Sequence, residues 1–146
     1  MVMAKDIMET VSKRIKEGWI KTWTATEVIA VTEEAAESSL KKHVELIGKE
    51  PDLMIYNVDY KKTEKTPHPF EKGKEAYTKV VEIELIARRF ENLVYFVLNY
   101  APSSIEIMEP NKIEIPMGEA QNVLNSMAEL VHSLVARTRG AVTIPT

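Results

Sequence analysis

Residues 23–60 read WTATEVIAVTEEAAESSLKKHVELIGKEPDLMIYNVDY, the pattern of a strand, a helix and a second strand. Before residue 32 the segment is rich in Thr, Val and Ile, which suit a half-buried strand. Thr32 stands where a helix N-cap is expected, and Gly48 followed by Pro51 would end the helix. The second strand alternates, which places four side chains on the face expected to meet the core: Met54, Tyr56, Val58 and Tyr60.

The first strand of this unit, from Trp19 to Val31, alternates less regularly. Thr22, Thr24 and Thr26 share a parity with Val28, so a bulge or a twist near Ala25 is expected. Trp19 and Trp23 are four residues apart on one strand face. They either stack on a planar ligand or cover the edge of the core beneath a helix.

The same order returns in residues 79–110, KVVEIELIARRFENLVYFVLNYAPSSIEIMEP. Val81, Ile83 and Leu85 alternate with glutamates, and a helix that is apolar nearly all round follows at residues 90–100. In both copies a proline precedes the last strand. Two such units predict an α+β, ferredoxin-like β-α-β-β-α-β sandwich with a four-stranded antiparallel sheet and an additional helix at each end.

The chain of 146 residues has the size of a single domain. Its expected segments are an N-terminal helix (1–18), a first β-α-β unit (19–62), a loop (63–76), a second β-α-β unit (77–110) and a C-terminal helix (117–138). Glu109 and Pro110 open a turn, after which Ile113 and Ile115 are expected to extend the last strand or pair beside it.

The amino-acid composition argues against several classes of function. The chain has no cysteine, which removes thiol catalysis, disulfides and thiolate zinc sites. With 19 basic and 22 acidic residues the net charge is −3, which argues against a large electrostatic surface for nucleic acid or an anionic membrane. The sequence carries no secretory signal and no apolar run that reaches a membrane span, so a cytoplasmic protein is expected. No cofactor or metal motif is present, and none is expected to bind.

The C-terminal helix and the apolar helix at residues 90–100 predict self-assembly. Ala120, Leu124, Met127, Val131 and Leu134 follow one another in steps of four and three, as in a heptad seam. The N-terminal helix and this C-terminal helix exceed what one sheet face needs for cover. Together with the apolar helix at residues 90–100, they predict a homodimer or a higher oligomer. The expected interface residues are Leu93, Phe96, Val97, Leu124, Met127, Val131 and Leu134.

A second face of the C-terminal helix is polar and holds little charge. Its candidate ligand-binding residues are Asn122, Asn125, Glu129 and His132. Glu129 and His132 are three residues apart and close enough to touch, which suits acid–base chemistry. The alternative is a solvated helix face with an incidental pair, and no catalytic residue is assigned.

Residues 61–77 read KKTEKTPHPFEKGKEAY and are expected to form an extended or disordered hairpin loop. The loop either contacts a protein or nucleic acid or is simply solvated. Its candidate contact residues are Lys61, Lys62, Lys65, His68, Phe70, Lys72 and Lys74. RNA-recognition domains share the β-α-β-β-α-β order but stack bases on aromatic residues of the third strand, and KVVEIELIA has none.

The stretch NYAPSSIEIMEP (residues 99–110) resembles small archaeal proteins of unknown function that carry N-Y-x-P-S-x-I-E-I-x-E-P. Residues 80–135 are also similar to the C-terminal extension of WYL-domain transcriptional regulators, in which a helix leads into a V-x-V-L-E-P-type strand. The chain lacks the helix-turn-helix and the WYL core of those regulators. This second resemblance therefore implies a fold and a ligand-sensing style, and it transfers no functional residue.

The residues and the resemblances together favour a non-catalytic regulatory, ligand-sensing or protein-interaction module that acts as a homo-oligomer. Its partners are then a second copy of the chain and a small molecule or a protein. Two alternatives stay open: an adaptor that binds nucleic acid through the Lys-rich hairpin of residues 61–79, and an enzyme that uses Glu129 and His132.

Overall fold

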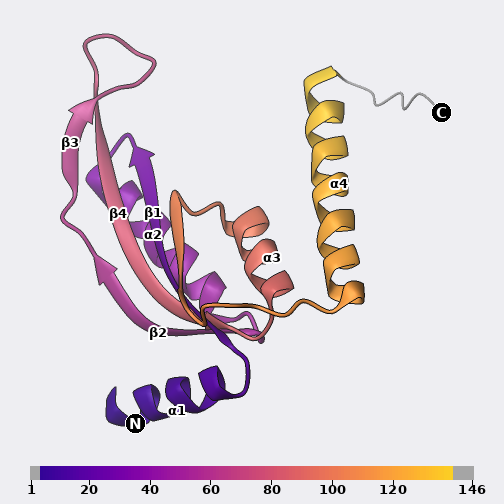
Figure 1. The fold of residues 1–146 in the computed structure, drawn as a ribbon. Helices are drawn as coiled ribbons and strands as arrows, with labels where there is room; N and C mark the ends of the chain where they lie inside the picture. The colour runs from indigo at the N-terminus through magenta and orange to yellow at the C-terminus, as the bar shows by residue number, and fades with distance from the viewer. Residues whose placement is uncertain (1–3, 140–146) are drawn as a thin grey trace.

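The computed structural model describes residues 4–139 and shows a mixed α/β protein with an open antiparallel sheet (Figure 1). Its elements in chain order are α1 (Ala4–Lys16), β1 (Ile20–Ala30), α2 (Glu33–Gly48), β2 (Leu53–Tyr60), β3 (Glu64–Pro67), β4 (Glu75–Ala87), α3 (Phe90–Tyr100), β5 (Ser104–Glu109) and α4 (Met117–Arg139). The helix expected at residues 90–100 is confirmed, and residues 1–3 of the expected N-terminal helix lie outside the described residues. No helix among residues 4–139 is long and apolar enough to cross a membrane.

The sheet has five strands in the order β2-β4-β1-β5, and β3 also pairs with β4. The strand β3 was not expected. It lies in the segment predicted to be a loop, where Glu64 to Pro67 pair with β4 from Thr78 back to Glu75. The segment from 63 to 76 therefore forms the end of a hairpin with an irregular tip at residues 68–74, and backbone hydrogen bonds and the bond from Lys79 Nζ to Thr63 Oγ1 join its two arms.

The central pair of strands, β1 and β4, runs without a break from Ile20 opposite Ala87 to Ala30 opposite Tyr77. Of the two alternatives expected near Ala25, the bulge is therefore wrong, and the twist stays a prediction. Irregularities occur instead where β1 meets β5, between Lys21 and Thr22, and inside β2.

The irregularity in β2 overturns the predicted alternation of that strand. Ile55 pairs with Leu85 and Asn57 with Glu84, so Tyr56 is the extra residue of a bulge. Leu53, Ile55 and Val58 consequently pack against the core, whereas the Tyr56 ring turns to the opposite face, 5.8 Å from Lys21 Nζ. A one-residue insertion moves the side chains on one side of it to the other face of the strand. The alternation of the sequence does not reveal where such an insertion lies.

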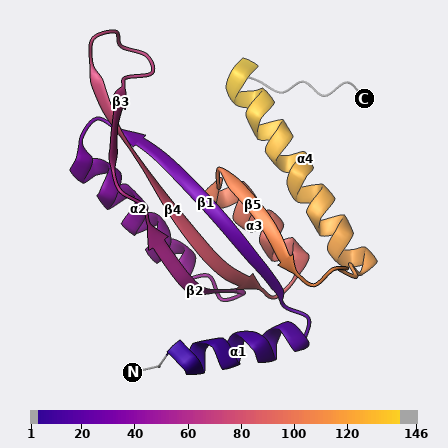
Figure 2. The same ribbon diagram turned by 60° about the vertical axis from the view of Figure 1, so that its left-hand side comes forward.

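The core lies between one face of the sheet and the helices α2 and α3. Ile83 and Leu85 of β4 are fully buried there, as expected, beneath Leu40 of α2 and Phe96 of α3. The β1 threonines face the same core, and Thr24 Oγ1 donates a hydrogen bond of 3.1 Å to the Ile83 carbonyl oxygen. The opposite face is covered at one end only, where α1 lies across it (Figure 2).

The segment between β5 and α4 forms neither a strand nor a helix. Ile113 packs against the core cluster, so the expected extension of the last strand by Ile113 and Ile115 is wrong. This anchored segment carries the chain from the sheet edge to the start of α4.

Candidate interaction surface

A groove of about 640 Å³ lies between α3, the edge strand β5 and α4. Leu93 forms part of its floor and also belongs to the core, so the groove is an outward continuation of the core. Its lining is almost entirely apolar: Phe90, Leu93, Val94, Val97, Leu98, Ile105, Glu106, Ile107 and Met127. The pattern of α3 explains the groove, because a helix that is apolar nearly all round must expose one apolar side after the other meets the sheet.

The strand β5 forms one wall of this groove. Ile105 pairs with Thr24 and Ile107 with Thr22, which places both isoleucines on the core face of the sheet. They nevertheless stay 39% and 42% exposed, because they line the groove between β5 and α3. The strand also lies at the edge of the sheet, so one row of its backbone groups has no strand partner within the described chain.

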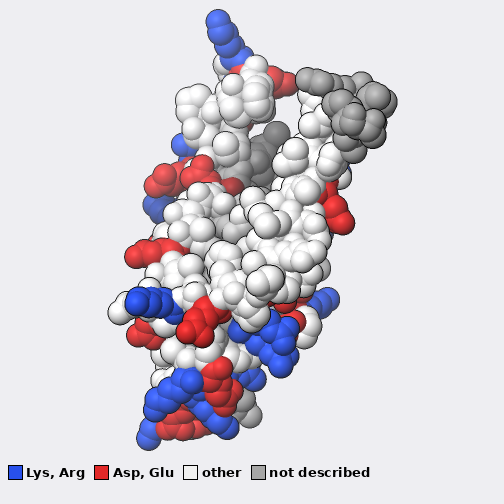
Figure 3. Space-filling model, turned by 45° about the vertical axis from the view of Figure 1, so that its right-hand side comes forward, with Lys and Arg blue, Asp and Glu red and all other residues white. Residues whose placement is uncertain are grey.

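The helix α4 lies on the outer side of α3 and β5 and presents its own apolar seam. Four seam residues keep about half of their surface exposed: Leu124 (65%), Met127 (48%), Val131 (58%) and Leu134 (50%). Viewed from the side of α4, the centre of the molecule shows few charged side chains (Figure 3). The groove and the seam share Met127, and we call the two together the α3–β5–α4 surface.

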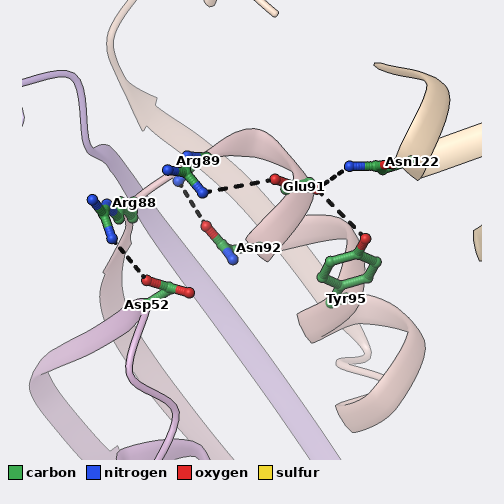
Figure 4. Close-up of polar contacts among 7 residues, drawn as sticks. All are labelled: Asp52, Arg88, Arg89, Glu91, Asn92, Tyr95 and Asn122. Carbon is green, nitrogen blue, oxygen red and sulfur yellow. Dashed lines mark hydrogen bonds and ion pairs between the residues drawn. The ribbon is translucent and has the colours of Figure 1, made fainter. Parts of the chain in front are cut away.

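Polar contacts hold the first half of α4 against α3. Asn122 Nδ2 donates to Glu91 Oε2 over 3.4 Å, and the same carboxylate accepts a bond of 3.5 Å from the Tyr95 hydroxyl (Figure 4). Val123, one residue further, is buried. Burial and then the nearby Glu91 charge raise the pKa of Glu119 in the first turn of α4, and Arg89 partly opposes this rise. Among the described residues, no side-chain hydrogen bond joins α4 to α3 beyond Asn122, and the seam from Leu124 onward stays exposed.

The structure places the predicted interface residues in two groups. Val97, Leu124, Met127, Val131 and Leu134 lie on or beside the α3–β5–α4 surface and are at least partly exposed. Leu93 and Phe96 are buried in the core, so they support the surface from beneath.

The predicted ligand-binding residues of α4 do not converge on a cavity. Asn122, Asn125, Glu129 and His132 are all exposed, and only Asn122 has a described side-chain contact, with Glu91. Within residues 4–139 no hydrogen bond or ion pair joins Glu129 to His132. Over the same residues, no group of three or more His, Asp or Glu side chains is placed to hold a metal ion.

Most lysines of the predicted contact loop are paired with acids. Lys61 Nζ lies 2.6 Å from Asp59 and 2.8 Å from Glu82, and these hydrogen bonds raise the pKa of Lys61. Lys65 pairs with Glu75 over 3.1 Å and Lys74 with Glu71 over 2.8 Å. Lys62 and Lys72 are exposed without an ion pair in the described part of the chain. The pairing lowers the positive charge that this hairpin offers to a nucleic acid.

The hairpin tip is ordered around His68. Its Nδ1 atom accepts hydrogen bonds from the backbone N–H groups of Phe70 and Glu71, at 3.1 and 3.0 Å. Phe70 is 91% exposed beside the His68 ring. A single exposed aromatic side chain at a loop tip is common on protein surfaces and carries no functional argument.

The open face of the sheet gives a further comparison with RNA-recognition domains. Trp23 and Tyr56 lie there, but Trp23 has Glu84 of β4 and Glu106 of β5 as its cross-strand neighbours. Burial, then the charges of Glu84 and Glu109, raise the pKa of Tyr56 to about 12. The acidic surroundings of both rings disfavour a phosphate backbone.

Sequence reasoning missed part of the groove. Val94, Leu98, Ile105 and Ile107 line it but were not among the predicted interface residues. The alternation of Ile105 and Ile107 with polar residues indicates that one face of this strand is apolar. It does not indicate whether a helix of the same chain covers that face.

Comparison with known proteins gives a match to the MJ0538 family over residues 21–145. This family is named for an archaeal protein of unknown function. No curated protein and no solved structure matches the chain. The resemblance of residues 80–135 to WYL-domain regulators stays a prediction.

Proposed function

The chain belongs to the MJ0538 family, and we propose that it is a non-catalytic regulatory or protein-interaction module that acts in the cytoplasm as a homodimer or higher oligomer. The single observation that carries this proposal is the uncovered α3–β5–α4 surface. The absence of cysteine fits a cytoplasmic location.

We further propose that the architecture is a ferredoxin-like sandwich with one added strand. The order β5-β1-β4-β2, with α2 and α3 contributing to one core on one sheet face, supports this arrangement. The strand β3 then prolongs the β2 edge along β4. In such a sandwich one edge is formed by β5, and the α3–β5–α4 surface lies beside that edge.

The free energies of burial and association indicate how much of the α3–β5–α4 surface a partner must cover. Burying an aliphatic side chain fully contributes about 1.5–3 kcal/mol, so each half-exposed seam residue offers roughly 1 kcal/mol. Association costs at least about 4 kcal/mol in lost freedom. The four seam residues of one subunit barely offset this cost. The eight seam residues of a symmetric pair leave a net of about 4 kcal/mol, which corresponds to a dissociation constant of about 1 mM, so a stable complex must bury the groove together with the seam.

A second copy of the chain meets this requirement. Seam and groove are both apolar and lie on the same side of the molecule, so a two-fold axis lets the seam of each subunit cover the groove of the other. Direct pairing of two β5 edges is less favourable. A register centred on Glu106 would place two Glu106 carboxylates opposite each other, and like charges there destabilise a strand pair.

Light scattering after gel filtration tests the assembly at micromolar concentration. The full chain is expected to elute as a dimer or larger species, and Val131→Glu combined with Leu134→Glu is expected to elute as a folded monomer. Ser133→Glu is the matched control, since it adds a charge on an exposed part of α4 outside the seam. A monomeric parent protein, or a double variant with unchanged mass, would overturn the proposal.

A further inference from the structure

A separate cavity of about 460 Å³ lies where α1, the start of β1 and the β4–α3 turn meet. Its lining consists of Arg14, Glu17, Trp19, Arg88 and Arg89. Three guanidinium groups against one carboxylate make the lining positive, in a chain whose net charge is −3. This concentration of arginine is not explained by the α3–β5–α4 surface.

The backbone of the α1–β1 turn fixes the first part of the cavity. Gly18 has φ +103°, in the left-handed region that favours glycine, and the Trp19 N–H donates to the Arg14 carbonyl oxygen over 3.0 Å. This turn brings the side chains of both residues together, with the Arg14 guanidinium 4.7 Å from the centre of the Trp19 ring.

The second part of the cavity comes from the β4–α3 turn. Ala87 pairs with Ile20, so Arg88 follows directly beside the start of β1, and its N–H donates to the Asp52 carbonyl oxygen over 2.9 Å. Figure 4 shows the guanidinium groups of Arg88 and Arg89 at this turn, each reaching toward one carboxylate. The distances are 3.5 Å to Asp52 and 3.9 Å to Glu91.

These two ion pairs leave the arginines able to bind an anion. A close charge-assisted hydrogen bond measures about 2.7–2.9 Å, and both pairs are longer. The Arg88 and Arg89 side chains are half exposed, and an exposed pair such as Arg88–Asp52 contributes little to stability. An anionic ligand can therefore replace Asp52 beside Arg88 at small cost and share Arg89 with Glu91.

Arg14 has no carboxylate partner at all within residues 4–139. Its described polar contact is to the Met54 sulfur atom at 3.4 Å, and sulfur is a weak acceptor. Packing on Trp19 accounts for the position of the guanidinium but leaves most of its five N–H donors unused. In addition, α3 begins at Phe90, so the positive end of a helix dipole lies at the same turn.

We propose that this cavity binds the phosphoryl group of a small ligand, either inorganic phosphate or a nucleotide. The planar guanidinium fork matches phosphate oxygens with two parallel hydrogen bonds, and three such groups suit a dianion. The cavity volume is within the range of small-molecule sites. The site goes beyond the assembly proposal, and neither proposal depends on the other.

Calorimetric titration of the full chain tests the site with inorganic phosphate, AMP and the uncharged nucleoside adenosine. Both phosphate-bearing probes are expected to bind, more weakly at raised salt, whereas adenosine is not. An AMP affinity well above that of phosphate assigns a nucleotide, and similar affinities assign the phosphoryl group alone. Absence of binding for both phosphate and AMP would overturn the proposal, as would equal binding of adenosine and AMP.

Three variants distinguish a specific binding site from nonspecific electrostatic attraction of the ligand to the protein. Arg14→Ala and Arg88→Lys are each expected to weaken AMP binding by about tenfold or more. The second variant keeps the charge and lies on an exposed turn, so it stays informative if the loss of the Trp19 contact destabilises the first. Lys16→Ala removes a positive charge of α1 outside the cavity and is expected to leave the affinity nearly unchanged. An equal loss in all three variants would overturn the proposal.

Discussion

The two halves of the core face of the sheet are covered to very different degrees. In the half covered by α2, the helix residues Leu40 and Ile47 are fully buried in the core that they form with β4. Beside α3, the isoleucines Ile105 and Ile107 of β5 remain about two-fifths exposed, although they point to the same face. Both halves have the apolar pattern of a core. One half is completed within the described chain, whereas the other is the half that a second copy covers in the proposed assembly.

The largest expected effect tests this contrast through stability. Leu40→Ala is expected to lower the free energy of unfolding by about 2–5 kcal/mol, since it leaves a cavity in a closed core. Ile107→Ala is expected to cost roughly 1 kcal/mol, because water already reaches this side chain. Urea unfolding measures both changes in the Val131→Glu and Leu134→Glu background, where assembly is expected not to contribute. An equal loss of unfolding free energy in Leu40→Ala and Ile107→Ala would contradict the difference between the covered and the uncovered half.

A smaller effect concerns the link between α3 and the covered half. The Tyr100 hydroxyl donates to Glu50 Oε1 over 2.6 Å, and this hydrogen bond, followed by burial and the Glu50 charge, raises the pKa of Tyr100 to about 12. Tyr100→Phe is expected to cost about 1 kcal/mol near neutral pH. Only the neutral phenol donates, so the contribution is complete below the ordinary pKa of 10.0 and is lost as the pH rises toward about 12.

Urea unfolding of the parent protein and of Tyr100→Phe, at neutral pH and near pH 12, measures this difference. Lysines titrate in the same range, so the informative quantity is the gap between the two proteins and not the stability of either. A gap that persists unchanged at high pH would contradict the assigned role of the phenol.

The smallest expected effect concerns the link between α3 and the uncovered half. Asn122→Ala removes an exposed hydrogen bond of 3.4 Å to Glu91 and is expected to cost about 0.5 kcal/mol. In the monomeric background, hydrogen exchange is expected to become faster in α4 and to stay unchanged in α2. Faster exchange in both helices would show that the two halves unfold together.

Long periodic segments allowed most of the fold to be predicted. The helix at residues 90–100 and the inward side chains Val81, Ile83 and Leu85 agree with the structure, because burial on a helix or strand repeats at a fixed spacing. The errors are local. The Tyr56 bulge and the short strand β3 arise from pairing with β4, which adjusts the register and adds hydrogen bonds that the sequence around them does not announce.

The two candidate sites also differ in whether the sequence could predict them. The seam residues Leu124, Met127, Val131 and Leu134 could be identified from their spacing. The arginine cavity could not, because Arg14 and Arg88 are far apart in the chain and meet only through the pairing of β1 with β4 and the turn at Gly18.

The sequence by itself determined the order of the helices and of the strands other than β3, and the apolar character of α3, β5 and α4, since periodicity is a local property of the chain. Only the tertiary structure decided which apolar residues are covered. Phe96 and Ile107 are both large apolar residues, yet Phe96 of α3 is buried against the sheet and Ile107 of β5 faces an open groove. Burial depends on which segments pack together across the sheet, and that is a property of the whole folded chain.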